Sequence, residues 1–182
     1  ESSIRKEKGT YIHKVIQLLV NNMVANRSID DREIISQARN ELLQLPEFRE
    51  FYKEYGENAF SLGIGGFNNL RTLAASIVKQ IYDNGTIINE LSNVDGNPEI
   101  FTEVSIYDKD SSTAGTIDLL VVYPNGTVGI YDYKSMNFSG GTDIKPVKMR
   151  AFELQLDWYK KILVNNYGVR DFAESRIIPI DV

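Results

Sequence analysis

Two runs rich in Val, Ile, Leu and Tyr flank a short turn, Pro124-Asn125-Gly126, between residues 115 and 135. Hydrophobic runs of this length around a turn that contains proline and glycine predict a β-hairpin. Apolar side chains occupy both alternating sets of positions in this hairpin, so both faces of the sheet need cover. We therefore expect an α/β fold in which helices pack on a central sheet.

The loop length of this hairpin decides which side chains face each other. A two-residue loop, Asn125-Gly126, would pair Asp118 with Tyr133 and would put Asp132 on the opposite face. A three-residue loop would be a type I turn followed by a left-handed residue, and it would pair Asp118 with Asp132. We favour the three-residue loop because proline suits the first corner and glycine suits the left-handed position.

In the favoured register, Asp118, Asp132 and Lys134 share one face of an otherwise apolar hairpin. Directly opposed carboxylates repel each other, and near a buried face they are costly unless they are paired or bind a cation. One interpretation is a salt bridge in which Lys134 neutralises one aspartate and water solvates the other. The second is a site for a hard cation such as Mg²⁺ or Mn²⁺, with the lysine next to a coordinated water molecule. The hairpin alone leaves both interpretations open.

The remaining pattern predicts helices in the first half of the chain, followed by strands and one further helix. Helical spacing of apolar residues predicts helices over Tyr11–Met23 (with Thr10 as N-cap), Asp30–Leu45, Glu47–Tyr55, Phe67–Asp83 and Ala151–Val164. Short β-rich runs predict strands over Thr86–Leu91, Ile100–Tyr107 and Arg176–Val182 in addition to the hairpin. Because a helix separates the hairpin from the last strand, we expect that strand to run parallel to the strand that carries Lys134.

A chain of 182 residues is long enough for one domain with a sizeable core. We expect a single domain over residues 1–182, with a helical insertion at about 27–85 between two parts of the core, about 9–26 and 86–182. The chain has no cysteine, which excludes disulfides and cysteine-ligated iron–sulfur clusters and fits a cytoplasmic protein.

Charge and hydropathy narrow the range of functions. The net charge of −5 argues against a protein that coats nucleic acid in general, but not against a nuclease whose carboxylates bind metal ions. No apolar run is long enough to span a bilayer, and no signal peptide is visible, so we expect no membrane partner. The chain begins with Glu1 rather than Met, as a processed form or an excised domain would.

Five short motifs occur in order along the chain, each within an element of the expected type. They are Gly9-x-x-x-His13, Glu103, Gly115-x-x-Asp118, Asp132-x-Lys134 and Gln155-x-x-x-Tyr159. Together they resemble the PD-(D/E)XK nuclease superfamily, and most closely its RecB-like exonuclease branch. The resemblance spans residues 9 to 160 and implies a restriction-endonuclease-like core, a mixed central sheet flanked by helices. Members of this branch that carry an iron–sulfur cluster hold it through cysteines, so we expect no such cluster here.

The resemblance also implies a role for each matching residue. The expected metal ligands are His13, Asp118, Asp132 and the backbone carbonyl of Tyr133. Lys134 would position the attacking water and help to deprotonate it, and Glu103 would support a second metal ion or orient water. The residues expected to support the site or contact DNA are Gln155, Tyr159, Lys148 and Arg150.

The predicted function is that of a metal-dependent DNA nuclease, and by its branch an exonuclease, that hydrolyses phosphodiester bonds with metal-activated water. One or two Mg²⁺ or Mn²⁺ ions would be the cofactor, because carboxylate oxygens suit Mg²⁺ and a histidine makes Mn²⁺ attractive as well. The implied partners are DNA, single-stranded or with free ends, and a helicase or larger polypeptide. Such a protein would act in DNA repair or recombination in the cytoplasm of a bacterium, or come from a phage.

Two other functions fit parts of the same pattern. The first is a catalytically idle module of this fold that binds nucleic acid or is structural, although an idle site has no physical reason to hold opposed carboxylates. The second is an RNA endonuclease of the viral cap-snatching kind, which also combines a helix histidine with carboxylates and a lysine. The pair Gln155 and Tyr159, together with Gly115, favours the DNA exonuclease branch over the second.

Overall fold

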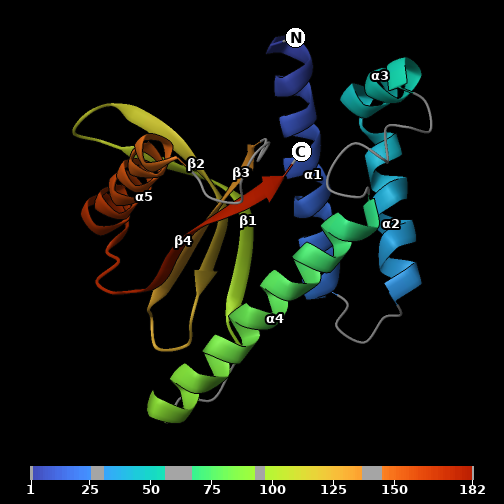
Figure 1. The fold of residues 1–182 in the computed structure, drawn as a ribbon. Coiled ribbons are helices and arrows are strands. Elements are labelled where there is room, and N and C mark those ends of the chain that lie inside the picture. The colour runs from blue at the N-terminus through green and yellow to red at the C-terminus, as the bar shows by residue number, and fades with distance from the viewer. Residues whose placement is uncertain (1, 26–30, 56–66, 93–96, 137–144, 182) are drawn as a thin grey trace. The chain divides into compact units, whose positions relative to one another are not determined.

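The computed structural model describes residues 2–25, 31–55, 67–92, 97–136 and 145–181. The described helices are α1 (Ser2–Ala25), α2 (Asp31–Gln44), α3 (Pro46–Tyr55), α4 (Phe67–Ser92) and α5 (Pro146–Tyr167) (Figure 1). The described strands are β1 (Glu99–Asp108), β2 (Thr113–Val122), β3 (Val128–Met136) and β4 (Phe172–Asp181). Helices and a four-stranded sheet together confirm the predicted α/β class. None of the described helices combines the length and the apolar character needed to cross a membrane.

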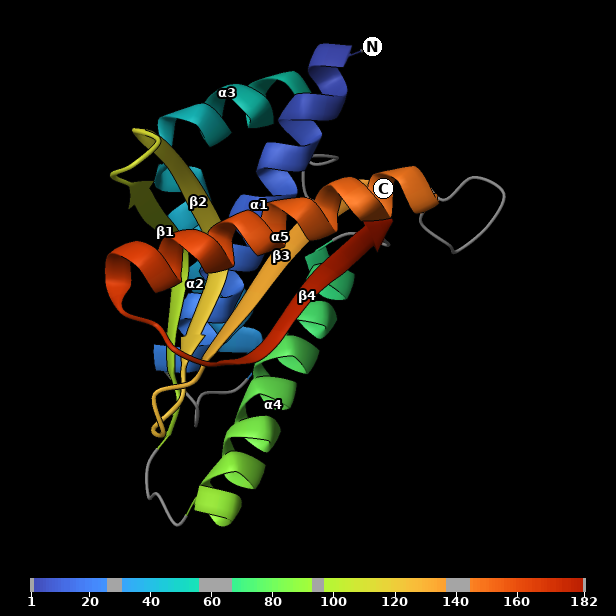
Figure 2. The ribbon, with the colours of Figure 1, turned by 90° about the vertical axis from the view of Figure 1, so that its left-hand side faces the viewer.

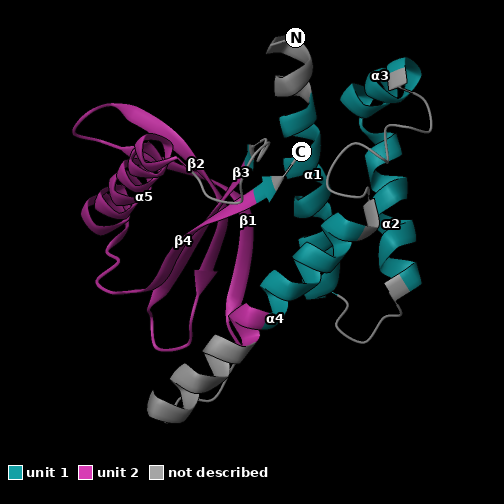
Figure 3. Ribbon diagram, in the orientation of Figure 1, with its two compact units in different colours: residues 1–79, 135–137, 180–182 teal, residues 80–134, 138–179 magenta. Residues whose placement is uncertain are grey.

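The chain divides into two compact units (Figure 3). Unit 1 consists of Glu1–Lys79, Ser135–Asn137 and Ile180–Val182, and unit 2 consists of Gln80–Lys134 and Phe138–Pro179. Unit 1 therefore contains α1, α2, α3 and the first half of α4, whereas unit 2 contains most of the sheet and α5. The single domain with an insertion at about 27–85 stays a prediction.

Unit 1 is built on the apolar face of α1, as the sequence pattern predicts. The predicted stripe is buried, with exposed fractions of 8% or less at Ile12, Val15, Ile16, Leu19 and Met23. Tyr11 packs on two rings of α3, with centroid distances of 5.2 Å to Phe48 and 5.0 Å to Phe51. Asn22 of α1 donates a hydrogen bond to Glu41 of α2 at 3.1 Å. Aromatic packing thus joins α1 to α3, and the polar contact joins α1 to α2.

Helix α1 begins at Ser2, so the predictions of a start at Tyr11 and of Thr10 as an N-cap are wrong. The preceding residues, Arg5–Lys8, are good helix formers, and the single Gly9 costs only about 1 kcal/mol in a helix interior. Within unit 1, a Cβ on Gly9 would lie 3.2 Å from Oγ of Ser135. Gly9 therefore also permits a close approach between α1 and the residue that follows Lys134.

Helix α4 runs through Asn84-Gly85 to Ser92, so the predicted stop at Asp83 and the predicted strand at Thr86–Leu91 are wrong. The apolar spacing explains the difference, because Ile88 and Leu91 continue the helical period set before the Asn-Gly pair. An Asn-Gly pair therefore lowers helix propensity at this point without ending the helix. Asp30, the predicted first residue of the second helix, lies outside the described residues.

Helix α5 is longer than the predicted Ala151–Val164 and begins at Pro146, a residue whose fixed φ suits the first helical position. It ends at Tyr167, and the capping residue Gly168 has a left-handed φ of 71° and an N–H that donates to the carbonyl of Leu163. Strand β4 also starts earlier than the predicted Arg176. These boundary differences leave the predicted order of elements in this half of the chain unchanged.

The sheet has the order β1-β2-β3-β4, with β1 antiparallel to β2 and β2 antiparallel to β3. Strands β3 and β4 start at the same end, where the N–H of Val128 donates to the carbonyl of Asp171 at 3.1 Å. The last strand therefore runs parallel to the strand that carries Lys134, as the helical crossover predicts. Figure 2 shows α5 lying across the face of this sheet.

The loop between β2 and β3 has three residues, as predicted. The N–H of Gly126 donates to the carbonyl of Tyr123 at 2.9 Å, and the N–H of Tyr123 donates to the carbonyl of Thr127 at 2.9 Å. Gly126 has the left-handed φ of 85° that the three-residue loop requires. The ladder accordingly pairs Leu119 with Tyr131, and continuing it by one residue puts Asp118 opposite Asp132.

Helix α5 covers one face of the sheet in unit 2 and forms its main core. The buried residues of this core are Ile106, Ile117, Val128, Ile130, Leu156, Tyr159, Ile162 and Leu163. Gly115 of β2 lies directly under the helix, since a Cβ there would be 2.9 Å from a ring carbon of Trp158 and 2.9 Å from one of Tyr159. A glycine at this position sets how closely α5 approaches β2.

The close approach at Gly115 predicts that Gly115→Ala destabilises the protein. The added methyl group would overlap the rings of Trp158 and Tyr159, and overpacking of this kind costs about 1–3 kcal/mol of unfolding free energy. Urea denaturation of the purified variant measures the change. In a Trp158→Leu background, where one of the two rings is gone, the same glycine substitution should cost less. Equal stability of wild type and Gly115→Ala would contradict the packing described for α5.

Candidate metal site at the fork of the hairpin

The described β2–β3 ladder runs from Val122 and Val128 to Leu119 and Tyr131. One residue further, Oδ2 of Asp118 accepts a hydrogen bond of 2.7 Å from the backbone N–H of Tyr133. A side-chain carboxylate thus takes the place that a backbone carbonyl holds in a regular ladder. Beyond this point β2 and β3 separate (Figure 2). The site lies where the two strands of the predicted hairpin fork.

Asp132 is the most deeply buried charged residue of the fork, with an exposed fraction of 3%. Its Oδ2 lies 3.0 Å from Nζ of Lys134, whose side chain is 25% exposed. The same oxygen is buried and accepts no hydrogen bond of good geometry from the residues that the structure describes. The ion pair predicted between a lysine and an aspartate is therefore present, but it is the only compensation found for this oxygen among those residues.

The Lys134 ammonium offsets only part of the cost of holding a charge on Asp132. Burial raises the pKa of Asp132 most, and the hydrogen bond and charge of the neighbouring Asp118 carboxyl raise it further. The Lys134 ammonium acts in the opposite direction, and the net result is a pKa of about 6. Two buried carboxyl groups that share a hydrogen bond therefore compete for one negative charge, and a further cation at the fork would relieve the competition.

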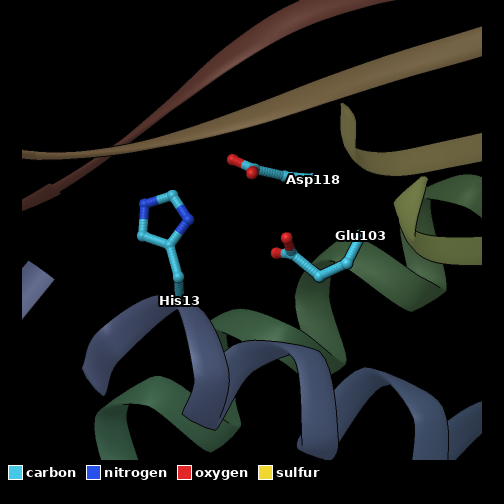
Figure 4. A group of neighbouring side chains, drawn as sticks. All are labelled: His13, Glu103 and Asp118. Atoms are coloured by element: carbon cyan, nitrogen blue, oxygen red, sulfur yellow. The ribbon is translucent and has the colours of Figure 1, made fainter. Parts of the chain in front are cut away.

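Glu103 of β1 brings a third carboxylate to the fork. The β1–β2 ladder pairs Thr102 with Leu119 and Val104 with Ile117, and between these pairs Glu103 has a left-handed φ of 51°. Carboxylate oxygens of Glu103 and Asp118 lie within 4.8 Å of each other (Figure 4). A left-handed conformation costs a residue other than glycine about 1–2 kcal/mol, and such strain clusters at functional sites.

The interruption at this position also changes which side chains face α5. Strict alternation would put Ile117 on the face of Leu119, whereas Ile117 packs against α5 together with Leu120 and Val122. Ile117, Asp118 and Leu119 are consequently three consecutive buried residues in β2. Because the ladder is interrupted at this position, β2 buries Ile117 in the core and the adjacent Asp118 in the site.

Two of the predicted supporting residues lie next to these acids. Tyr159 of α5 is buried, and its hydroxyl accepts a hydrogen bond of 2.9 Å from Nε2 of Gln155. Burial raises the pKa of Tyr159 to about 12, with further contributions from the charges of Asp132 and Asp118. The phenol thus stays protonated near neutral pH. Gln155 and Tyr159 share the face of α5 that points at the fork, as their spacing of four predicts.

A residue that the sequence patterns did not single out also borders the site. The ring of Phe152 on α5 lies with its centroid 5.2 Å from Nζ of Lys134. Its spacing of three from Gln155 and seven from Tyr159 puts it on the same helix face, and that spacing was the available signal. Lys148 and Arg150 are exposed in the first two turns of α5, and their contact with DNA stays a prediction.

His13 is on α1 in unit 1, whereas the carboxylates and Lys134 belong to unit 2. Its side chain is partly buried and lies one helical turn after Gly9, on the same side of α1. Its role as a metal ligand stays a prediction, as does that of the Tyr133 carbonyl. The described part of the site in unit 2 thus consists of the three carboxylates, Lys134 and the side chains of α5. Its ligand atoms are all oxygen, the element that Mg²⁺ and Mn²⁺ prefer.

The raised pKa of Asp132 predicts a pH dependence of stability in metal-free protein. Because the pKa rises from 3.8 to about 6 on folding, the folded state binds this proton more tightly than the unfolded state. The resulting stability is present below about pH 4 and is lost as the pH rises through 6, by up to about 2–3 kcal/mol. Urea denaturation between pH 4 and 8 in EDTA measures the loss, which Asp132→Asn should remove. The exposed Asp157→Asn is the control, and an equal slope in wild type and Asp132→Asn would contradict the assignment.

No protein-family model and no curated protein matches this chain. The resemblance to PD-(D/E)XK nucleases accordingly rests on the five motifs in the sequence and stays a prediction.

Proposed function

We propose that this protein is a Mg²⁺- or Mn²⁺-dependent DNA nuclease that hydrolyses phosphodiester bonds at the fork between β2 and β3. The observation that carries the proposal is the buried pair Asp118 and Asp132, held together beside Lys134 with its charge only partly offset. The choice of DNA and of exonuclease activity comes from the motif resemblance. Both parts are open to direct tests.

The residues at the fork fit a divalent cation. Among the described residues, buried Oδ2 of Asp132 has the Lys134 ammonium at 3.0 Å and accepts no hydrogen bond of good geometry, so a further cation would lower the cost of burying its charge. Oxygens of Glu103 and Asp118 lie within 4.8 Å of each other, so one ion could contact both carboxylates. Asp118 and Asp132 are the proposed principal ligands, and Glu103 supports them or holds a second ion. A divalent ion held there supplies positive charge next to the phosphate and lowers the pKa of a water molecule.

The side chains of this chain would then position the reactants. Lys134 presents a partly exposed ammonium with three N–H donors next to Asp132, which suits it to orient a water molecule and to stabilise negative charge that develops on the phosphate. Tyr159 and Gln155 form a hydrogen-bonded pair on the neighbouring helix face and would hold the DNA strand against the site. Lys148 and Arg150 at the start of α5 add positive charge for the flanking phosphates.

The proposal predicts cleavage of end-labelled DNA with Mg²⁺ or Mn²⁺ and none with EDTA. Replacing Asp118, Asp132 or Lys134 with Ala should lower the rate by at least about 10²–10³-fold, because each removes charge stabilisation or positioning at the reacting phosphate. Gel analysis of single-stranded DNA, duplex DNA and RNA measures the rate and the substrate class. Release of mononucleotides from an end would identify an exonuclease, and internal fragments an endonuclease.

Exposed residues of α5 provide matched controls for these variants. Asp157→Ala and Lys161→Ala remove the same kinds of charge from the same unit but lie on the solvent side of the helix. Both should cleave at the wild-type rate, and circular dichroism should show that all variants keep their helices. Cleavage by purified Asp132→Ala at the rate of Asp157→Ala would end the proposal. Cleavage of RNA in preference to DNA would keep the metal site but change the substrate class.

Metal binding can be tested without turnover. Titration calorimetry with Mn²⁺ should detect binding by the wild type, and Asp132→Asn should weaken it by at least about tenfold. Glu103→Gln and His13→Ala should also weaken binding if those residues are ligands, and they test the parts of the ligand set that rest on the resemblance. Exposed Asp157→Asn should bind as the wild type does. Equal affinity of wild type and Asp132→Asn would show that the ion binds elsewhere.

A further inference from the structure

The Lys134 ammonium is held between two groups of unlike chemistry. On one side Nζ lies 3.0 Å from Oδ2 of Asp132, and on the other it lies 5.2 Å from the centroid of the Phe152 ring. A cation within about 6 Å of the face of an aromatic ring is attracted by the negative charge density of that face. The ring therefore provides a second contact that fixes the direction of a long, flexible side chain.

Phe152 is not part of the apolar core that anchors α5. The core of unit 2 consists of the buried residues described above and of partly buried residues that pack against them, and these are Val104, Leu120, Val122, Trp158, Val169, Phe172 and Ile177. Phe152 belongs to neither set and is itself only partly buried. The ring lies over the ammonium of Lys134, which ties its position to the site.

An ammonium next to a group of carboxylates needs such a constraint. Asp118 and Glu103 lie close to each other at the same fork as Asp132, so a lysine side chain with four rotatable bonds has several acceptors to choose from. A lysine that moves between acceptors would be out of place for much of the time when a phosphate arrives. A ring on a rigid helix, one turn before Gln155, limits that movement.

We propose that Phe152 is a positioning residue that acts through Lys134, by holding the ammonium against Asp132 in the direction needed for phosphodiester cleavage. This inference rests on the proposed function of the same site. It assigns no chemical step to Phe152. It predicts that the aromatic face matters at this position and that apolar volume alone does not suffice.

The test compares Phe152→Leu, which keeps an apolar side chain without the ring, with Phe152→Tyr, which keeps the ring. Phe152→Leu should lower kcat for DNA cleavage by about 2- to 30-fold with little change in KM, and Phe152→Tyr should restore the wild-type kcat. Unit 2 supplies a matched control in a second pair, Lys160 over the ring of Phe172 at 5.6 Å, where Lys160→Ala should leave kcat unchanged.

A spectroscopic measurement tests the contact without reference to activity. Protons above an aromatic ring shift upfield, so the ε-methylene resonance of Lys134 should be displaced from those of the other lysines, with Lys134→Arg providing its assignment. Phe152→Leu should return it to the usual position, and Phe152→Tyr should not. Titration with Mn²⁺ should give the same affinity in wild type and Phe152→Leu, because the substitution removes none of the proposed carboxylate ligands.

The outcomes separate this inference from the proposed function. Wild-type kcat in Phe152→Leu, failure of Phe152→Tyr to restore a lowered kcat, or an unshifted Lys134 resonance in the wild type would each overturn the role of Phe152 while leaving the nuclease intact. Absence of cleavage by the wild type would overturn the proposed function, and the role of Phe152 in it would fall as well. A shifted resonance together with a lowered and restorable kcat would establish it.

Discussion

The repulsion between two opposed carboxylates at the fork of the hairpin is the constraint on which the site depends. The three-residue loop at Gly126 sets the register, and that register puts Asp118 opposite Asp132. Burial then makes it unfavourable for both to be charged, which is why the pKa of Asp132 rises to about 6 although an ammonium lies 3.0 Å away. A folded chain that accepts this cost without a ligand would be more stable with apolar residues at the same positions. The cost is understandable if a cation normally completes the pair.

The rest of unit 2 supports this pair in two ways. Glu103 takes up a strained left-handed conformation where the β1–β2 ladder is interrupted, and the interruption brings its carboxylate to within 4.8 Å of Asp118. Gly115 lets α5 approach β2 so closely that the rings of Trp158 and Tyr159 leave no room for a methyl group. Backbone strain and close packing thus serve the same end, which is to hold acidic, aromatic and cationic side chains at one fork.

Much of this arrangement could be predicted from the sequence because it depends on local rules. The turn Pro124-Asn125-Gly126 is sufficient to choose the loop length, and the loop length is sufficient to pair the aspartates. The α/β class, the order of elements from β1 to β4 and the parallel last strand follow from periodicity and from the rule for crossover connections. Single glycines predict helix bounds poorly here, because α1 continues through Gly9 and α4 continues through Gly85.

Other features depend on contacts between distant parts of the chain, which no single-sequence pattern encodes. Glu103 has a left-handed φ between two paired segments of the β1–β2 ladder, and its residue type does not predict that conformation. The place of Phe152 over Lys134 depends on the rotation of α5 against the sheet. The roles of His13 and of the Tyr133 carbonyl as ligands still rest on the motif resemblance. The aspartate pair is therefore the best-supported part of the site, and metal binding by this pair is the property to test.

The most direct test is anomalous diffraction from crystals of the protein grown with Mn²⁺. The account predicts a manganese peak at coordinating distance from a carboxylate oxygen of both Asp118 and Asp132, with the Lys134 ammonium still beside the site. A manganese peak that contacts neither aspartate, or an Asp132 that keeps only its ion pair with Lys134 at saturating Mn²⁺, would contradict it.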